Sequence, residues 1–540
     1  MIKFYGVVIS CLFQVYPGKF RSLCRMMAIL PIILFFPGVG STAPPVIGMN
    51  LTNITYWSRE LVFTDAFRTC MPWITQAIDV TPGEKPAWNT GFANVMPLSA
   101  NAYPSGIPFR PTGSAFDQIA ATLMRRGQDG HYPSGAYLCQ YAGDGELAFG
   151  LDARILFQNP GHIRLMVTPS NKGIFLKIVR SNPDDPIRNI RVFPENANDP
   201  NRFNPLFLER IKPFRVLRFM GWQAVNDSPV VLWSQRTRPE HYTQQQPGGM
   251  NLETMIDLCN HLAADPWFCM PHQADDTYIR QFAALVKHRL DPARRIYLEY
   301  SNEVWNPQFA QHEFVLDGKP SKTLPKRYAR NARNVFDIWH DEFGHNRSRV
   351  VRVLAGQQHN VWFLEQAVAE IGAASIDALA CGGYFGLQPE DLSSLKKLGS
   401  QTTIETVMDM AIRQLGQKAI PGLAAHADLA KRLGRDFYVY EGGQHLIPDP
   451  PGSSPDYLPA IVKAQSSGQM ADAYMTMLQA FVKMGGDLFM AFGFVSDQKS
   501  PWGAWGHLDH LSQSPADSPK FKALLEHMNQ TQPDATIVKP

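Results

Sequence analysis

Two glutamates in this chain of 540 residues each follow a strand-like stretch, and their neighbours are of types that can bind or cleave a sugar. Residues 295–306 (RIYLEYSNEVWN) begin with a pattern that predicts a buried strand. Where that strand ends, Glu303 stands next to the carboxamide of Asn302, and Glu441 ends a second such stretch. Two facing carboxylates suit glycoside cleavage, in which one attacks the anomeric carbon and the other moves protons. A solvated loop carboxylate is the alternative interpretation of Glu303.

Further polar and aromatic residues follow other strand-like stretches. In a barrel of parallel strands the catalytic groups lie at the carboxyl ends of the strands, so the residues that end each stretch are the candidates. The candidates for substrate binding are Arg218, His272, Asn302, Tyr384, Trp502 and Trp505. A cation, an imidazole, a carboxamide, a phenol and two indoles would then meet the two carboxylates on one face.

Several of these residues also have a structural interpretation. Arg218 can be a plain ion-pair partner of Glu441. His272 and His359, which follow the third and fifth strands, are as easily structural as substrate-binding. Glu299 is a rival carboxylate, but its place within the strand favours a supporting role in the interior of a barrel.

The elements that position these residues alternate between strands and helices. Near-continuous apolar stretches predict eight strands, near residue 48 and at residues 214–220, 267–271, 296–300, 349–355, 376–382, 436–441 and 487–494. Helical patterns separate them, including a long one at 403–433. Alternating helices and buried strands indicate a parallel sheet, and eight of each favour a closed (β/α)8 barrel, the TIM barrel of the α/β class.

A different pattern interrupts the barrel. Residues 75–189 are dense in glycine and proline and contain short strand-like runs, which predicts a small antiparallel β-sandwich inserted after the first strand. The expected division is a first barrel strand within residues 44–74, the inserted β-rich domain at 75–189, the rest of the barrel at 190–530 and a tail at 531–540.

Residues 1–43 are expected to be a signal peptide. Basic residues precede an apolar run at 27–36, and small residues at 41–43 offer a cleavage site. This pattern predicts a secreted or periplasmic protein that has no membrane partner after cleavage. Translation from Met26 or Met27 and a retained anchor are the alternatives, and the run is short for a full span.

Composition argues against several other classes of protein. A net charge of +3 without a basic stripe argues against nucleic-acid binding, and the glycine-rich motifs of nucleotide-binding proteins are absent. Two of the seven cysteines fall in the first 43 residues, and the other five are scattered. They support neither a disulfide framework nor a metal site, although Cys259 and Cys269 are a conceivable pair. We therefore expect no metal and no cofactor.

The residues at two strand ends resemble a known group of enzymes. Residues 299–303 (EYSNE) and the Tyr440–Glu441 pair resemble clan A of the retaining glycoside hydrolases, whose members are (β/α)8 barrels. The resemblance covers the first strand and the region after Asn189, and its most specific motif is the Asn-Glu pair. The stretch SNEVWN is also similar to that of secreted bacterial proteins labelled cellulose-binding. The clan often has proline where Val304 stands.

The resemblance implies a role for each matching residue. Glu303 would be the acid/base and Glu441 the nucleophile, and Asn302 would bond to the 2-hydroxyl of the sugar. The other matching positions, which would hold the nucleophile and the sugar, are Arg218, His272 and Tyr384.

The expected function is hydrolysis of β-glycosidic bonds in an oligo- or polysaccharide by double displacement. Retention of configuration in such a reaction needs the two carboxyl groups about 5–5.5 Å apart. Two alternatives remain open at this point. One is a carbohydrate-binding protein without turnover, and the other is a transglycosylase of exopolysaccharide or cell-wall assembly, which would use the same residues.

Overall fold

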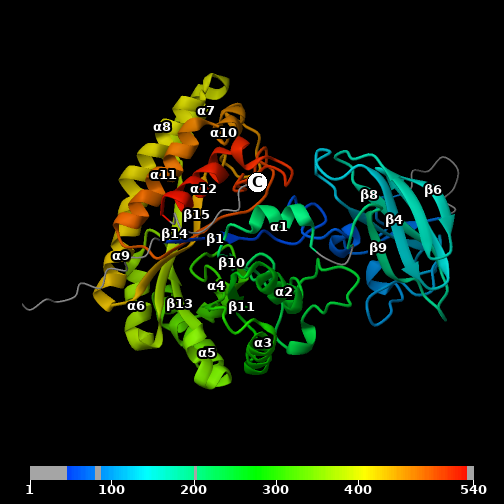
Figure 1. Ribbon diagram of the computed structural model, residues 1–540, viewed down its shortest axis with the longest axis horizontal. Coiled ribbons are helices and arrows are strands. Elements are labelled where there is room, and N and C mark those ends of the chain that lie inside the picture. Colours follow the sequence, from blue (N-terminus) through cyan, green and yellow to red (C-terminus); the bar gives the residue numbers. More distant parts are fainter. Residues whose placement is uncertain (1–44, 79–86, 200–202, 532–540) are drawn as a thin grey trace, which may run out of the picture. The chain divides into compact units, whose positions relative to one another are not determined.

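Eight parallel strands close into a barrel within residues 45–78, 87–199 and 203–531, which are those that the computed structural model describes (Figure 1). The strands follow one another around the barrel in chain order. They are β1 (Val46–Asn50), β10 (Val216–Arg218), β11 (Asp265–Met270), β12 (Ile296–Tyr300), β13 (Val350–Gly356), β14 (Ala378–Gly386), β15 (Asp436–His445) and β16 (Leu488–Ala491). The predicted (β/α)8 barrel is thereby confirmed.

The two faces of the barrel strands pack against different neighbours. In β12, Leu298 belongs to the core between the strands and the surrounding helices. Tyr297 instead packs inside the barrel against Trp267 and Tyr438, with ring centroids 5.6 and 5.7 Å away. Both faces are buried, and this explains why the strands appear as near-continuous apolar stretches in the sequence.

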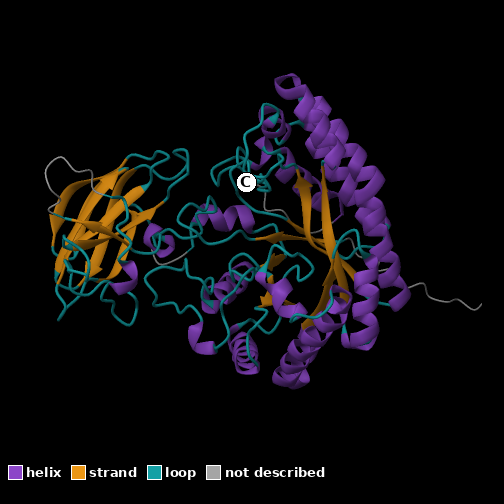
Figure 2. Cartoon of the chain, turned by 180° about the vertical axis from the view of Figure 1, so that it is seen from behind, coloured by secondary structure: helices purple, strands orange, loops and turns teal. Residues whose placement is uncertain are grey.

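Helices surround the barrel strands (Figure 2). They are α1 (Pro205–Ile211), α2 (Leu252–Leu262), α3 (Asp276–Arg289), α4 (Ala310–Leu316), α5 (Leu324–Phe343), α6 (Val361–Ile371), α7 (Pro389–Leu398), α8 (Ile404–Gln414), α9 (Ile420–Leu433), α10 (Leu458–Ala464), α11 (Gly468–Lys483) and α12 (Pro519–Thr531). The long helix predicted at 403–433 is interrupted. A π-helical turn, η8 (Leu415–Ala419), separates α8 from α9.

Two antiparallel sheets lie in the segment between β1 and α1. One has the strand order β2-β3-β8-β5 and the other β6-β7-β4-β9. Their strands are β2 (Ile74–Ala77), β3 (Gln118–Met124), β4 (Gly135–Ala142), β5 (Gly145–Leu151), β6 (Ala153–Asn159), β7 (His162–Val167), β8 (Ile174–Ser181) and β9 (Arg188–Pro194).

The β-rich segment extends slightly beyond its expected bounds, because β2 begins at Ile74 and β9 ends at Pro194. The sheets and the barrel fall within one compact unit. That residues 75–189 form a separate domain therefore stays a prediction.

The remaining expectations concern cysteines and export. All five cysteines in the described part of the chain are free and buried, so Cys259 and Cys269 are not paired. No helix among the described residues is long and apolar enough to cross a membrane. The expected signal peptide lies outside the described residues, as does the tail expected at 531–540 except for Thr531, which ends α12. The localisation stays a prediction.

Candidate active site

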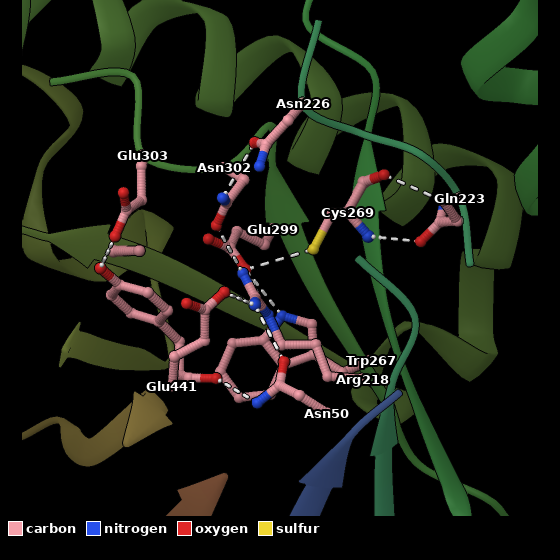
Figure 3. Close-up of polar contacts among 12 residues, drawn as sticks. Asn50, Arg218, Gln223, Asn226, Trp267, Cys269, Glu299, Asn302, Glu303 and Glu441 are labelled. Atoms are coloured by element: carbon pink, nitrogen blue, oxygen red, sulfur yellow. Dashed lines mark hydrogen bonds and ion pairs between the residues drawn. The ribbon is translucent and has the colours of Figure 1, made fainter. Parts of the chain in front are cut away.

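Arg218, the last residue of β10, connects two carboxylates at the centre of the site (Figure 3). Its Nη1 donates to Glu441 Oε1 at 2.6 Å, and its Nε and Nη2 donate to Glu299 Oε2 at 3.2 and 2.9 Å. Nη1 also donates to Asn50 Oδ1 and Nη2 to Asn302 Oδ1, at 3.1 and 3.0 Å. The guanidinium is fully buried. Its rigid, planar set of donors therefore fixes where both carboxylates lie.

A β-bulge in β15 directs Glu441 into the barrel. Cys381 of β14 pairs with Val439, but the next residue, Gly382, pairs with Glu441, so Tyr440 is one residue too many for the ladder. Side chains of a regular strand alternate between its faces, and a bulge re-aims those that follow it. Tyr440 packs inside the barrel, and the bulge lets Glu441 reach the same interior.

Glu441 is held by a cation and a phenol. Besides the ion pair with Arg218, the Oη of Tyr384 donates to Glu441 Oε2 at 2.9 Å. Burial raises the pKa of Glu441 to about 7, while Arg218 and the hydrogen bond from Tyr384 act in the opposite direction. The charge of Glu303 adds to the rise, so the two carboxylates interact electrostatically.

Glu303, in contrast, receives hydrogen bonds from neutral groups. The Oη of Tyr440 donates to its Oε1 at 3.0 Å, and Asn306 Nδ2 donates to its Oε2 at 3.1 Å. The backbone is left-handed at Ser301 and at Glu303, with φ of 58° and 40°. Residues other than glycine rarely adopt this conformation, which persists where the surroundings hold it and which collects at functional sites.

Asn302 is held on both sides of its carboxamide. Its Oδ1 accepts from Arg218, and its Nδ2 donates to Asn226 Oδ1 at 3.0 Å. Gln311 Nε2 donates to Asn226 Oδ1 and to the carbonyl oxygen of Asn302, at 2.8 and 2.9 Å. Sequence reasoning missed Asn226 and Gln311, because they lie in a loop and on α4 and so end no barrel strand.

Glu299 takes the supporting place expected for it. Its side chain is buried below the strand ends, and its Oε2 accepts from Arg218 and from Trp267 Nε1, the latter at 2.9 Å. Cys269 Sγ lies 3.4 Å from the same oxygen. Glu299 therefore fixes Arg218 from the side opposite to Glu441. No group of three or more histidine, cysteine or acidic residues that could hold a metal occurs in the described part of the chain.

His272 lies at a strand end but makes no hydrogen bond to Glu303 or Glu441. Its ring packs edge-on against Phe314, with centroids 5.1 Å apart, and burial lowers the pKa of His272. Its Nδ1 is buried without a hydrogen-bond partner among the described residues. A neutral ring with an unpartnered nitrogen can bond to a sugar hydroxyl, and substrate binding by His272 stays a prediction.

The two tryptophans differ in how they relate to the site. Trp505 packs against His445 and Phe492, and both of these pack against Tyr384. Trp502 is 67% exposed and has no ring contact with that group. The structure thus connects Trp505 to the site through its neighbours, and substrate binding by Trp502 stays a prediction.

Comparison with known proteins gives similarity in fold at low identity. No family model and no curated protein matches the chain. It is similar to the solved structure of a family 51 α-L-arabinofuranosidase from Bifidobacterium longum, with 12% identity, 55% of this chain and 62% of that chain covered, and a TM-score of 0.38. It is also similar to an arabinofuranosidase from Xanthomonas axonopodis pv. citri, with 14% identity, 56% of this chain and 62% of that chain covered, and a TM-score of 0.37. For a modular endo-β-1,4-mannanase from Cellulomonas fimi the identity is 12%, 59% of this chain and 63% of that chain are covered, and the TM-score is 0.33.

These similar structures are, by name, glycoside hydrolases, the class that the strand-end motifs resemble. The similarity covers less than two thirds of the length of each of those chains. At these identities and TM-scores the similarity carries no further argument, and the barrel is shown by the strand pairing itself. The chemistry proposed below is therefore argued from the geometry of the site.

Proposed function

We propose that this protein is a retaining glycoside hydrolase that cleaves β-glycosidic bonds in an oligo- or polysaccharide. The observation that carries the proposal is the unequal partnering of Glu441 and Glu303. Glu441 is paired with the cation Arg218, whereas Glu303 is bonded to a phenol and a carboxamide. A carboxylate held by a cation suits the nucleophile. A carboxyl group among neutral donors suits the residue that gives up and regains a proton.

The first step of the proposed reaction forms a bond between a Glu441 oxygen and the anomeric carbon. The bond from that carbon to the leaving oxygen breaks, and the proton of Glu303 passes to the leaving oxygen. In the second step the oxygen of a water molecule bonds to the anomeric carbon and its proton passes to Glu303. The bond to Glu441 then breaks, so both residues return to their starting states. Two inversions at one carbon retain its configuration.

The surrounding side chains support these roles. Tyr384 and Arg218 hold opposite oxygens of Glu441, which orients the carboxylate for attack. A carboxamide has two N–H donors, and Asn226 is the one acceptor for the Nδ2 of Asn302 among the described residues. The second hydrogen can therefore bond to the 2-hydroxyl of the sugar, which is the role implied by the clan resemblance.

The proposal is tested by incubating the purified protein, with Glu441→Gln as the inactive control, with a panel of polysaccharides. We expect new reducing ends that appear first as the β-anomer in proton NMR. Transfer products without new reducing ends would indicate a transglycosylase. Binding without turnover, equal in the control, would indicate a carbohydrate-binding protein. An α-anomer formed first would contradict retention.

The pKa of Glu441 gives a prediction for pH dependence. Glu441 attacks only when ionised, so we expect kcat/KM to fall about tenfold per pH unit as the pH drops below about 7, the raised pKa of Glu441. Tyr384→Phe removes a hydrogen bond to the ionised form and should move this acidic limb to higher pH. The measurement is a pH profile of kcat/KM on an uncharged substrate. An acidic limb near the ordinary value of 4.5 would contradict the prediction.

A further inference from the structure

A cavity of about 540 Å³ lies beside the candidate active site. The turn after β13 contributes Gln358 and His359 to its lining, and the residue before α7 contributes Gln388. Lys418 of η8 and His426 of α9 complete the polar part of the lining. None of these side chains has a part in the proposed reaction.

One residue connects this cavity with the carboxylates. Gln358 Nε2 donates to the carbonyl oxygen of Tyr384 and its Oε1 accepts from the N–H of Tyr384, each at 2.9 Å. The hydroxyl of Tyr384 in turn donates to Glu441. Gln358 therefore belongs both to the wall of the cavity and to the surroundings of Tyr384, the residue that holds Glu441.

The cavity carries an uncompensated positive charge. Lys418 is exposed and makes no ion pair or hydrogen bond within the described chain. Burial lowers the pKa of His359, and the nearby charge of Lys418 lowers it further. No aspartate or glutamate is among the described residues that line the cavity. An anion in the cavity would thus meet a cation that no protein carboxylate neutralises.

A neutral hydrogen-bond acceptor lies at the wall of the same cavity. His426 is 1% exposed, and its Nδ1 is 2.9 Å from the carbonyl oxygen of Gly422. A carbonyl oxygen can only accept, so Nδ1 carries the hydrogen and Nε2 a lone pair. That Nε2 has no partner among the described residues. Buried polar atoms are seldom left unpaired, so this nitrogen is a polar group at the cavity wall that still lacks a donor.

The backbone that presents Lys418 is itself unusual. Lys418 belongs to the π-helical turn η8, which separates two α-helices. Such turns are rare and occur frequently at functional sites, where the wide turn changes which side chains face a neighbouring surface. This one brings a lysine to the wall of the cavity.

We propose that this cavity is a subsite for an anionic sugar unit, one that carries a carboxylate or a sulfate, in the substrate on which Glu303 and Glu441 act. That this sugar unit belongs to the substrate of Glu303 and Glu441 rests on the proposed function. Lys418 would pair with the anion, with His359 beside it. The substrate class is therefore an acidic glycan rather than a neutral one.

The test uses monosaccharides, so that it does not depend on a particular linkage. Binding of methyl β-glucuronide, methyl β-galacturonide, glucose 6-sulfate and methyl β-glucoside to the full chain is measured by ligand-observed NMR titration. We expect at least one anionic sugar to bind about fivefold more tightly than the glucoside, the size of effect that a partly exposed charge pair provides. Lys418→Met should abolish that difference.

The matched control is Lys431→Met. Lys431 is an exposed lysine of α9 that does not line the cavity, so its variant should keep the preference for the anion. Equal binding of all four sugars, or an unchanged preference in Lys418→Met, would overturn the inference. If the preference behaves as expected and no glycan is hydrolysed, the subsite stands and the hydrolase proposal fails. If neutral glycans are hydrolysed and no anionic sugar is preferred, the hydrolase proposal stands and the subsite is overturned. Tighter binding of a glycuronide would identify the anion as a carboxylate, and tighter binding of glucose 6-sulfate would identify it as a sulfate.

Discussion

Glu441→Ala is expected to abolish turnover on every substrate, whereas Glu303→Ala is expected to spare the first step on substrates with an activated leaving group. Without Glu441 no oxygen remains to form the covalent intermediate. Without Glu303 an aryl glycoside whose leaving group needs no proton still reacts with Glu441. Cleavage of unactivated glycosides by Glu303→Ala should fall by about 10²–10⁴-fold, the usual contribution of general acid–base catalysis. The measurement is kcat for each variant on an aryl glycoside and on a glycan.

Azide separates the two roles further. In Glu303→Ala the second step is slow for want of a base, and azide needs no deprotonation, so it should restore turnover and give a glycosyl azide of retained configuration. Glu365→Ala, at an exposed position on α6, is the control and should behave as the wild type. The roles would have to be exchanged if azide rescued Glu441→Ala with inverted product while Glu303→Ala stayed inactive on aryl glycosides.

Arg218→Met is expected to lower the free energy of unfolding by about 3–5 kcal/mol, the cost of leaving a buried charge without its partner. Arg218 is the cation that contacts Glu441 and Glu299, which are both buried. Its loss also leaves oxygens of Asn50 and Asn302 without a donor. The measurement is chemical denaturation followed by circular dichroism.

The control for this prediction is Arg432→Met, which removes an exposed ion pair with Glu365 and should lower the free energy of unfolding by at most about 1 kcal/mol.

The stability deficit of Arg218→Met, which is its loss of free energy of unfolding relative to the wild type, should also depend on pH. The folded-state pKa of Glu441 is already raised by burial and rises further without the cation, so the folded variant binds more protons than the unfolded chain. Its stability therefore falls as the pH increases, and the deficit should be larger at pH 8 than at pH 5. A deficit under about 1 kcal/mol at pH 8 would contradict the structural account of Arg218.

The barrel could be predicted from the sequence because its strands are buried on both faces. In β12, Ile296, Leu298 and Tyr300 pack toward the helices and Tyr297 packs inside the barrel, which makes the strand visible as one short apolar stretch. The residue after such a stretch lies at the carboxyl end of the barrel, and this rule found Glu303 and Asn302. The rule depends only on chain order, so it works without knowledge of packing.

Other parts of the site depend on packing that sequence periodicity does not reveal. Tyr440 lies in an apolar stretch and looks like core, and the bulge that lets Glu441 join it inside the barrel has no sequence signature. The π-helical turn with Lys418 reads as an ordinary helix, because its residues are good helix formers apart from one glycine. A strand end fixes where a loop begins but not where the loop leads, so the sequence alone does not place the exposed Trp502.

The identity of the residue that becomes covalently attached to the sugar tests the central claim most directly. A 2-deoxy-2-fluoro glycoside with a good leaving group slows the second step more than the first, so the intermediate accumulates, and peptide mass spectrometry can locate it. The structure predicts attachment to Glu441, in the peptide that contains the bulge of β15. Attachment to Glu303 or Glu299, or an α-anomeric product formed without any adduct, would contradict the account.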